Sequence, residues 1–170
     1  MNVNDTQISD TVAGVMVNYL TNTTKLTKFK CGNNPSLFRK GDYSCISEMI
    51  RGNKTLKNVN ISDLNLPPEH IDGIFDAIVN HPSLVKLTLD GNPAGSYMDK
   101  ISQLLASCQN LQSLRVRKLE AISRDEMIDW INNELPPVMS IETMHVAGNK
   151  ITTADIVPAI NAHIKIHFKF

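Results

Sequence analysis

Pairs of basic side chains spaced two residues apart are the residues of this sequence best suited to bind anions. Lys28 and Lys30 form one such pair and Arg115 and Arg117 form another, with Lys86 in a similar segment. Residues two apart point to the same face of a β-strand, so each pair would act on one side of a sheet. A guanidinium can donate two parallel hydrogen bonds to a carboxylate or phosphate, which makes Arg115 and Arg117 the best candidates for such contacts.

Other chemically active residue types lack the spacing that catalysis or metal binding needs. His145, His163 and His167 fall near the end of the chain, but no cysteine or carboxylate stands among them in a metal-ligand pattern. The three cysteines are scattered and form no CxxC pair. We recognise no nucleophile motif and no glycine-rich phosphate loop. We therefore expect no catalytic residue, no metal and no cofactor, and we predict that the chain is not an enzyme.

The composition suits one domain with an aliphatic core. Of 170 residues, 42% are hydrophobic and only 5% are aromatic. The 17 Lys and Arg side chains balance the 17 Asp and Glu side chains, so we expect no whole-molecule field for nucleic acid or an anionic membrane. The first ten residues lack the features of a secretory signal, and no apolar run reaches the roughly 18 residues of a spanning helix. We expect a cytoplasmic protein.

One pattern of apolar residues recurs five times along the chain. Its clearest copy runs from Leu84 to Asn92 and reads LxxLxLxxN. Copies begin every 27 to 30 residues, at Leu26, Leu56, Leu84, Leu111 and Ile141. Five matches in one frame indicate a repeat protein. In each copy the apolar residues would point into a core from a short strand, and the residues between them would point the other way.

The segments between the copies predict helices. Before the third copy, apolar residues follow Ile71 at the spacing of an amphipathic helix. Ser123 followed by Glu126 resembles a capping box, and Pro68 suits a first helical turn. Helices pack farther apart than paired strands do, so stacking one of each per repeat curves the array. We predict an α/β solenoid, a curved horseshoe segment with parallel strands on the concave face and helices on the convex face.

We predict a single domain over residues 1–170. Residues 1–25 are expected to hold an N-terminal capping helix, from about Ile8 to Thr21, with no strand before it. Residues 26–149 are expected to hold about five repeats, and residues 150–170 a C-terminal cap with a closing strand that does not fit the repeat pattern.

These repeats resemble the leucine-rich-repeat superfamily, and their length is most similar to its ribonuclease-inhibitor-like branch. Their number also resembles the leucine-rich domain of tropomodulin-type actin regulators, although no tropomyosin-binding segment is visible. Small leucine-rich effectors of bacterial pathogens are a looser resemblance. Because the motif consists of core positions, the resemblance implies the fold and does not imply a ligand.

The ninth position of the motif departs from the family pattern. It alternates between asparagine at Asn34, Asn92 and Asn149 and leucine at Leu64 and Leu119. The resemblance implies that a buried asparagine bonds to the backbone of adjacent turns. We therefore expect an asparagine ladder that is broken in alternate repeats.

Residues between the inward apolar positions, and those in the turns just beyond, should line the concave face. The candidate partner-binding residues are Lys28, Lys30, Asn58, Asn60, Lys86, Thr88, Asp90, Arg115, Arg117, Lys118 and His145. On these strands and turns six basic residues stand against Asp63 and Asp90, which is six minus two, or a net charge of plus four, in a neutral chain. This balance favours an acidic partner surface or a phosphorylated ligand. The alternative is that exposed strand positions carry charge only for solvation.

Trp130 is the only tryptophan, and its environment is open to two interpretations. Its place in the repeat matches Gly73 and Lys100, which should face outward, and an exposed tryptophan would mark an interface. The extra Pro136 and Pro137 change the local register, however, and would let the indole pack between helices. We favour packing.

Together these features favour a protein-interaction module, that is, an adaptor, scaffold or inhibitor that binds through its concave face. A bacterial effector that acts on a host protein inside the host cell is one alternative. A binder of a phosphorylated or nucleic-acid ligand is an alternative of another class, although the neutral total charge argues against nucleic acid. We expect a protein partner, no membrane association and a chain that is monomeric by itself.

Overall fold

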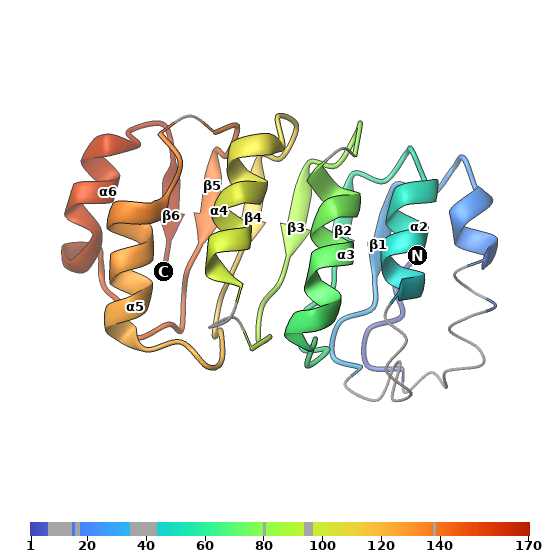
Figure 1. The fold of residues 1–170 in the computed structure, drawn as a ribbon, viewed down its shortest axis with the longest axis horizontal. Coiled ribbons are helices and arrows are strands. Elements are labelled where there is room, and N and C mark those ends of the chain that lie inside the picture. The colour runs from blue at the N-terminus through green and yellow to red at the C-terminus, as the bar shows by residue number, and fades with distance from the viewer. Residues whose placement is uncertain (7–14, 16–17, 35–43, 80, 94–96, 138) are drawn as a thin grey trace.

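The computed structural model describes residues 1–6, 15, 18–34, 44–79, 81–93, 97–137 and 139–170. Within them, six short strands alternate with helices (Figure 1). The strands are β1 (Lys28–Lys30), β2 (Asn58–Asn60), β3 (Lys86–Thr88), β4 (Ser113–Arg115), β5 (Thr143–His145) and β6 (His167–Lys169). The helices are α2 (Ser44–Gly52), α3 (Pro68–Val79), α4 (Met98–Ser107), α5 (Arg124–Asp129) and α6 (Val157–Ala162). A π turn, η1 (Trp130–Glu134), continues α5, and a 3₁₀ turn, η2 (Thr153–Ile156), precedes α6.

The strands form one parallel sheet in sequence order, from β1 to β6. Each parallel pair needs a crossover connection, and the helices supply it on one side of the sheet. Figure 1 shows these helices side by side in front of the strands. The α/β solenoid of leucine-rich-repeat type is confirmed. Among the described residues, none of the helices combines the length and apolar character that crossing a membrane requires.

The core lies between the sheet and the helices and consists of the repeat positions. The central residues of β2 to β5, Val59, Leu87, Leu114 and Met144, are fully buried. The apolar residues that stand six positions before each copy of the motif, Leu20, Ile50, Ile78, Leu105 and Leu135, are at most 8% exposed. Since a single turn cannot enclose its own apolar residues, contacts between neighbouring turns stabilise the fold.

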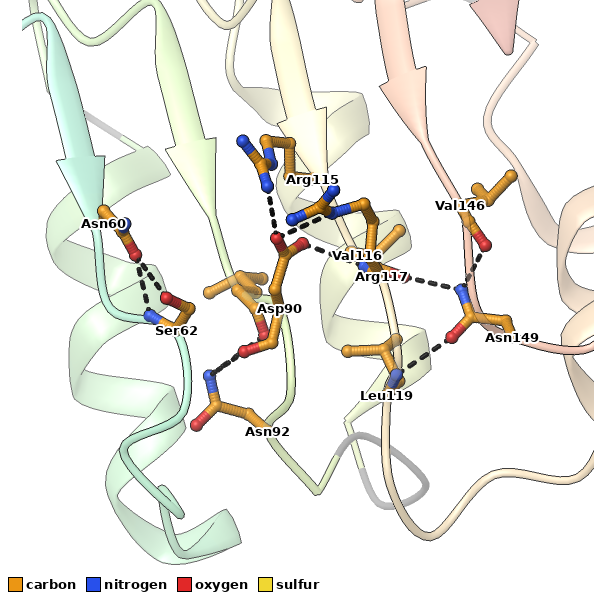
Figure 2. Close-up of polar contacts among 11 residues, drawn as sticks. Asn60, Ser62, Asp90, Asn92, Arg115, Val116, Arg117, Leu119, Val146 and Asn149 are labelled. Atoms are coloured by element: carbon orange, nitrogen blue, oxygen red, sulfur yellow. Dashed lines mark hydrogen bonds and ion pairs between the residues drawn. The ribbon is translucent and has the colours of Figure 1, made fainter. Parts of the chain in front are cut away.

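The buried asparagines at the ninth position of the motif, Asn92 and Asn149, each bond to their own turn and to the turn before it. Asn92 Nδ2 donates to the carbonyl oxygen of Leu89 in its own turn and to that of Ile61 in the preceding turn. Its Oδ1 accepts from the N–H of Leu64, also in the preceding turn. Asn149 makes the equivalent bonds to Val116, Leu119 and Val146 (Figure 2). Asn92 thus joins the second turn to the third, and Asn149 joins the fourth to the fifth, in agreement with a ladder that is interrupted in alternate repeats.

The first residues of the chain extend the sheet beyond β1. The Met1 amino group donates to the Lys28 carbonyl oxygen at 2.7 Å, and the Lys30 N–H donates to the Met1 carbonyl oxygen at 3.2 Å. Val3 N–H donates to the Lys30 carbonyl oxygen at 2.8 Å, and Asn2 forms a parallel bridge with Lys30. The repeat pattern predicts no strand here, but this segment covers the outer edge of β1.

Asn34 joins this N-terminal segment to the asparagine ladder. Its Nδ2 donates to the Val3 carbonyl oxygen, and its Oδ1 accepts from the Thr6 N–H. Most of the helix predicted from Ile8 to Thr21 falls outside the described residues, although residues 18–22 are helical.

The helix-start motifs of the sequence occupy helix starts in the structure. Ser123 Oγ accepts from the Glu126 N–H, and the Glu126 carboxylate accepts from the Ser123 N–H. Hydrogen bonds from the Ser123 backbone and side chain to the Glu126 carboxylate lower the pKa of Glu126. Pro68 begins α3, and Thr152 with Asp155 forms a second capping box before η2.

Candidate protein-binding face

Two rows of side chains cross the sheet on its concave face, the face that points away from the helices. The strand register aligns residues at equivalent positions from β1 to β6. The first row is Lys28, Asn58, Lys86, Ser113, Thr143 and His167. The second row is Lys30, Asn60, Thr88, Arg115, His145 and Lys169. The predicted strand residues thus do lie together on one face.

The accessibility of the predicted residues is uneven. Lys28 and Lys118 are exposed. The half-buried ones are Lys30, Asn58, Asn60, Lys86, Arg115, Arg117 and His145. Thr88 and Asp90 are only 4% and 7% exposed, so they offer a partner little surface. Thr88 lies in its row between two longer side chains, and Asp90 is occupied with internal contacts.

Asp90 bonds to both of the arginines from which free bidentate contacts are expected (Figure 2). Its Oδ2 accepts from Arg115 Nη2 at 2.8 Å and from Arg117 Nε at 2.9 Å. Its Oδ1 accepts from the backbone N–H of Arg117 at 2.9 Å. A carboxylate this shielded from water needs such partners, because an unpaired buried charge is strongly destabilising. Asp90 therefore orients both guanidinium groups and occupies part of each.

Positive charge still dominates around Lys86. Burial lowers the pKa of Lys86, and the charges of Arg115, Lys30 and Lys169 lower it further. Asp90 acts in the opposite direction and does not outweigh them. Like charges that depress the pKa of an amine create a positive potential at that point.

His145 lies in the same potential. Its pKa is lowered first by burial and then by the charges of Arg115, Lys169, Lys86 and Arg117. We call Lys30, Lys86, Arg115, Arg117, His145 and Lys169 the basic cluster. An anion placed on this cluster would relieve the repulsion among its members.

Lys169 belongs to the basic cluster but is absent from the candidates derived from the sequence. The register places it beside His145 at the end of the second row. The alternation of apolar and basic residues near the end of the chain indicated a strand. Because that strand does not fit the repeat motif, its register against β5 could not be assigned.

A second polar ladder, which the sequence did not lead us to expect, lies in the turns before the strands. Asn53 Nδ2 bonds to the Leu20 carbonyl oxygen, and His81 Nε2 bonds to the Asn53 carbonyl oxygen at 2.6 Å. His81 is 3% exposed, and its burial lowers its pKa although the bond to Asn53 opposes the shift. These two residues stand three positions before Leu56 and Leu84, and that common position in the repeat would have revealed the ladder.

Trp130 is packed, which confirms the favoured interpretation. It is 1% exposed, and its Nε1 donates to Ser102 Oγ on the neighbouring α4 at 2.8 Å. The π turn η1 begins at Trp130 and carries more residues per turn than an α-helix, which changes the register at this point.

Groups suited to metal or thiol chemistry are not assembled in the described part of the chain. No set of His, Cys, Asp and Glu side chains there is placed to hold a metal ion. Cys31 fills an inward repeat position, and burial raises the pKa of its thiol, which makes it unreactive.

Comparison with known proteins gives a result for the fold only. No protein-family model matches the chain, and no curated protein matches it. The tropomodulin C-terminal domain of Caenorhabditis elegans is similar, with a TM-score of 0.63 and 13% identity over 90% of this chain and 92% of that one. Leiomodin-1 Actin-Binding Site 2 is similar with a TM-score of 0.59 and 22% identity over 67% of each chain. This chain shares their fold. The predicted resemblance to tropomodulin-type leucine-rich domains is thus confirmed for architecture.

Proposed function

We propose that the chain is a protein-interaction module that binds an acidic surface of a partner protein through the concave face. The basic cluster carries the proposal. It holds five Lys and Arg side chains, from β1, β3, β4, β6 and the turn after β4, and Asp90 compensates one of them, so five minus one leaves four positive charges on one face of the sheet. Complementary charge of this kind steers association and selects partners. An adaptor, a scaffold and an inhibitor would all use the face in this way.

The test should reverse charges that the fold does not need. Arg115 and Arg117 are unsuitable, because replacing them would leave the shielded Asp90 carboxylate without its partners. We therefore choose the double substitution Lys30→Glu and Lys86→Glu. The matched control is Lys25→Glu with Lys54→Glu, which makes the same charge change at exposed positions outside the two rows.

Immobilised chains would be used to capture proteins from cell extract, with recovery measured by quantitative mass spectrometry. We expect the unmodified chain and the Lys25→Glu, Lys54→Glu control to recover the same acidic proteins. This recovery should fall as the salt concentration rises. The concave variant, Lys30→Glu with Lys86→Glu, should no longer recover these proteins. Equal recovery by the concave variant would remove the concave face from the proposal.

Actin is the first named partner to test, because a domain of similar fold is named for an actin-binding site. We propose it for this chain on that ground. Co-sedimentation with purified actin filaments, using the two double variants, measures it directly. Binding that survives the concave substitutions would place actin on another face, and absence of binding would remove actin from the proposal.

The remaining predictions need tests of their own. Delivery of a reporter fusion into host cells would support the effector alternative, and no delivery would contradict it. Binding to an oligonucleotide that falls steeply with salt would support the nucleic-acid alternative. The ribonuclease-inhibitor-like branch, the monomeric state and the cytoplasmic location stay predictions.

A further inference from the structure

We propose that the outer edge of β6 accepts an extended segment of another protein as a seventh strand, and that this segment alternates acidic and apolar residues. The site lies at the C-terminal end of the sheet, so it does not depend on the function proposed for the concave face. Three observations support it. Backbone groups of β6 point away from the sheet, an extended segment pairs with the opposite edge at β1, and the last turn carries alternating basic and apolar residues.

The edge of β6 has backbone groups that point away from the sheet. β6 is the last strand in the sheet order. His167 N–H donates to the Glu142 carbonyl oxygen, and the Lys169 carbonyl oxygen accepts from Val146 N–H, so both residues bond toward β5. Alternate residues of a parallel strand bond to opposite sides. The N–H and C=O of Phe168 are therefore directed outward, where a further strand would pair.

The opposite edge of the same sheet shows what an added segment does. At β1, the backbone of Met1 and Val3 bonds to Lys28 and Lys30 at 2.7 to 3.2 Å. Within the described residues, no segment covers β6 in this way. Figure 1 places β1 and β6 at opposite ends of the sheet. In the described part of the chain, extended backbone thus pairs with the β1 edge of the sheet, whereas the β6 edge has no such partner.

The chemistry of the last turn selects the added segment. From His163 onward, basic or histidine residues alternate with apolar ones, and no acidic residue occurs between Val157 and Phe170. The register puts His167 and Lys169 on the concave side of the edge. A strand beside them is most stable with opposite charges directly across. A second copy of β6 would place like charges together, so we assign the edge to a different, acidic chain.

The apolar half of the segment would meet the open end of the core. Among the described residues, Ile164 is 81% exposed and Val157 and Phe170 are each 46% exposed. Ile160 and Phe168 pack only partly against the core. Apolar side chains on the inward side of an added strand would cover this surface. In other complexes in which a peptide extends a sheet, alternate side chains of the peptide likewise enter apolar pockets.

The first test uses a short synthetic peptide of alternating glutamate and valine as the probe. Amide hydrogen exchange of the whole chain is followed by NMR with and without the peptide. Exchange at Phe168 should slow by tenfold or more, whereas His167, which already bonds to β5, should change little. A peptide of alternating lysine and valine is the control and should not protect Phe168. Unchanged exchange at Phe168 with saturating glutamate peptide would overturn the proposal.

The second test removes the outward donor. Phe168→Pro lacks the outward N–H, and Phe168→Val keeps it while also shortening the side chain. By fluorescence anisotropy with labelled peptide, we expect the proline variant to bind at least tenfold more weakly than the valine variant. Equal affinities would contradict the proposal. If Phe168→Pro does not fold, the exchange measurement on the unmodified chain decides.

The edge and the concave face can be separated experimentally. The Lys30→Glu, Lys86→Glu variant leaves the β6 backbone intact, so it should bind the peptide within a few-fold of the unmodified chain. Loss of peptide binding in that variant would assign the peptide to the concave face and overturn the edge site. Retained binding, with loss of the captured proteins, would support both proposals separately.

Discussion

Two sets of polar residues interact between neighbouring repeats. They differ in whether their hydrogen-bonding groups and charges find complementary partners. In the interior, Asn92 and Asn149 are neutral and bond to the backbone of two turns each. On the concave face, burial lowers the pKa values of Lys86 and His145, and the like charges around them lower these values further. The interior set holds adjacent turns together, whereas the concave set retains repulsion that a bound anion would remove. Stability and binding are thus separated within the same repeats.

The largest expected effect comes from breaking the interior set. Asn92→Ala would leave the N–H of Leu64 and the carbonyl oxygen of Ile61 without their buried partner. Each unsatisfied buried group costs about 1–3 kcal/mol, so we expect the free energy of unfolding to fall by about 3–5 kcal/mol. Urea denaturation measures this change. The control Asn58→Ala, on the concave face, should stay within about 0.5 kcal/mol of the unmodified chain. An equal loss of unfolding free energy in Asn92→Ala and Asn58→Ala would contradict the proposed difference between the interior and the concave residues.

A second prediction concerns Asp90, whose carboxylate bonds to the concave arginines and whose carbonyl oxygen accepts a hydrogen bond from Asn92 in the interior. Asp90→Asn would remove the buried carboxylate that orients Arg115 and Arg117, and we expect the free energy of unfolding to fall by about 1–3 kcal/mol. The same change should lower the pKa of Lys86 further, because Asp90 opposes the surrounding cations. NMR titration of the Lys86 side chain follows the second effect. A pKa that rises or does not move would show that Asp90 does not balance the cluster.

The second polar ladder, in which His81 bonds to the Asn53 carbonyl oxygen, predicts a pH dependence of stability. The pKa of His81 is below 6.5 in the folded protein, so below about pH 6.5 the unfolded chain binds more protons. Stability contributed by neutral His81 is therefore present above pH 6.5 and declines as the pH falls. In His81→Asn, which carries the residue found at the equivalent position of the preceding repeat, this slope should be smaller. Urea denaturation from pH 5 to 8 tests it, and an unchanged slope would exclude His81 as a source.

The smallest change in the free energy of unfolding is expected at Tyr97, a buried polar residue of the interior. Tyr97 is 1% exposed, and its hydroxyl has no hydrogen-bond partner among the described residues. Tyr97→Phe should therefore leave the free energy of unfolding unchanged within about 0.5 kcal/mol or raise it slightly. The melting temperature provides the measurement. A loss of more than about 1 kcal/mol would mean that the hydroxyl does have a partner.

The repeat pattern was sufficient to predict the architecture and the face. Apolar residues at fixed positions from Leu26 to Val146 determine which side chains enter the core, and a strand alternates its two faces with a period of two. Lys30, Lys86 and Arg115 could therefore be placed on one surface by their positions in the repeat alone. Helix-start motifs such as Ser123 with Glu126 are equally local, since both partners lie within one turn of helix.

Only the tertiary structure decided what these residues contact. The bonds from Asp90 to Arg115 and Arg117 and the bond from Trp130 to Ser102 join residues 25 to 28 positions apart. Such contacts depend on the register between turns and on which rotamer reaches across, and neither follows from periodicity. The place of Lys169 in the basic cluster required the pairing of β6 with β5. The sequence by itself determined the repeat and the concave rows, whereas contacts between repeats decided which charges on those rows remain available to a partner.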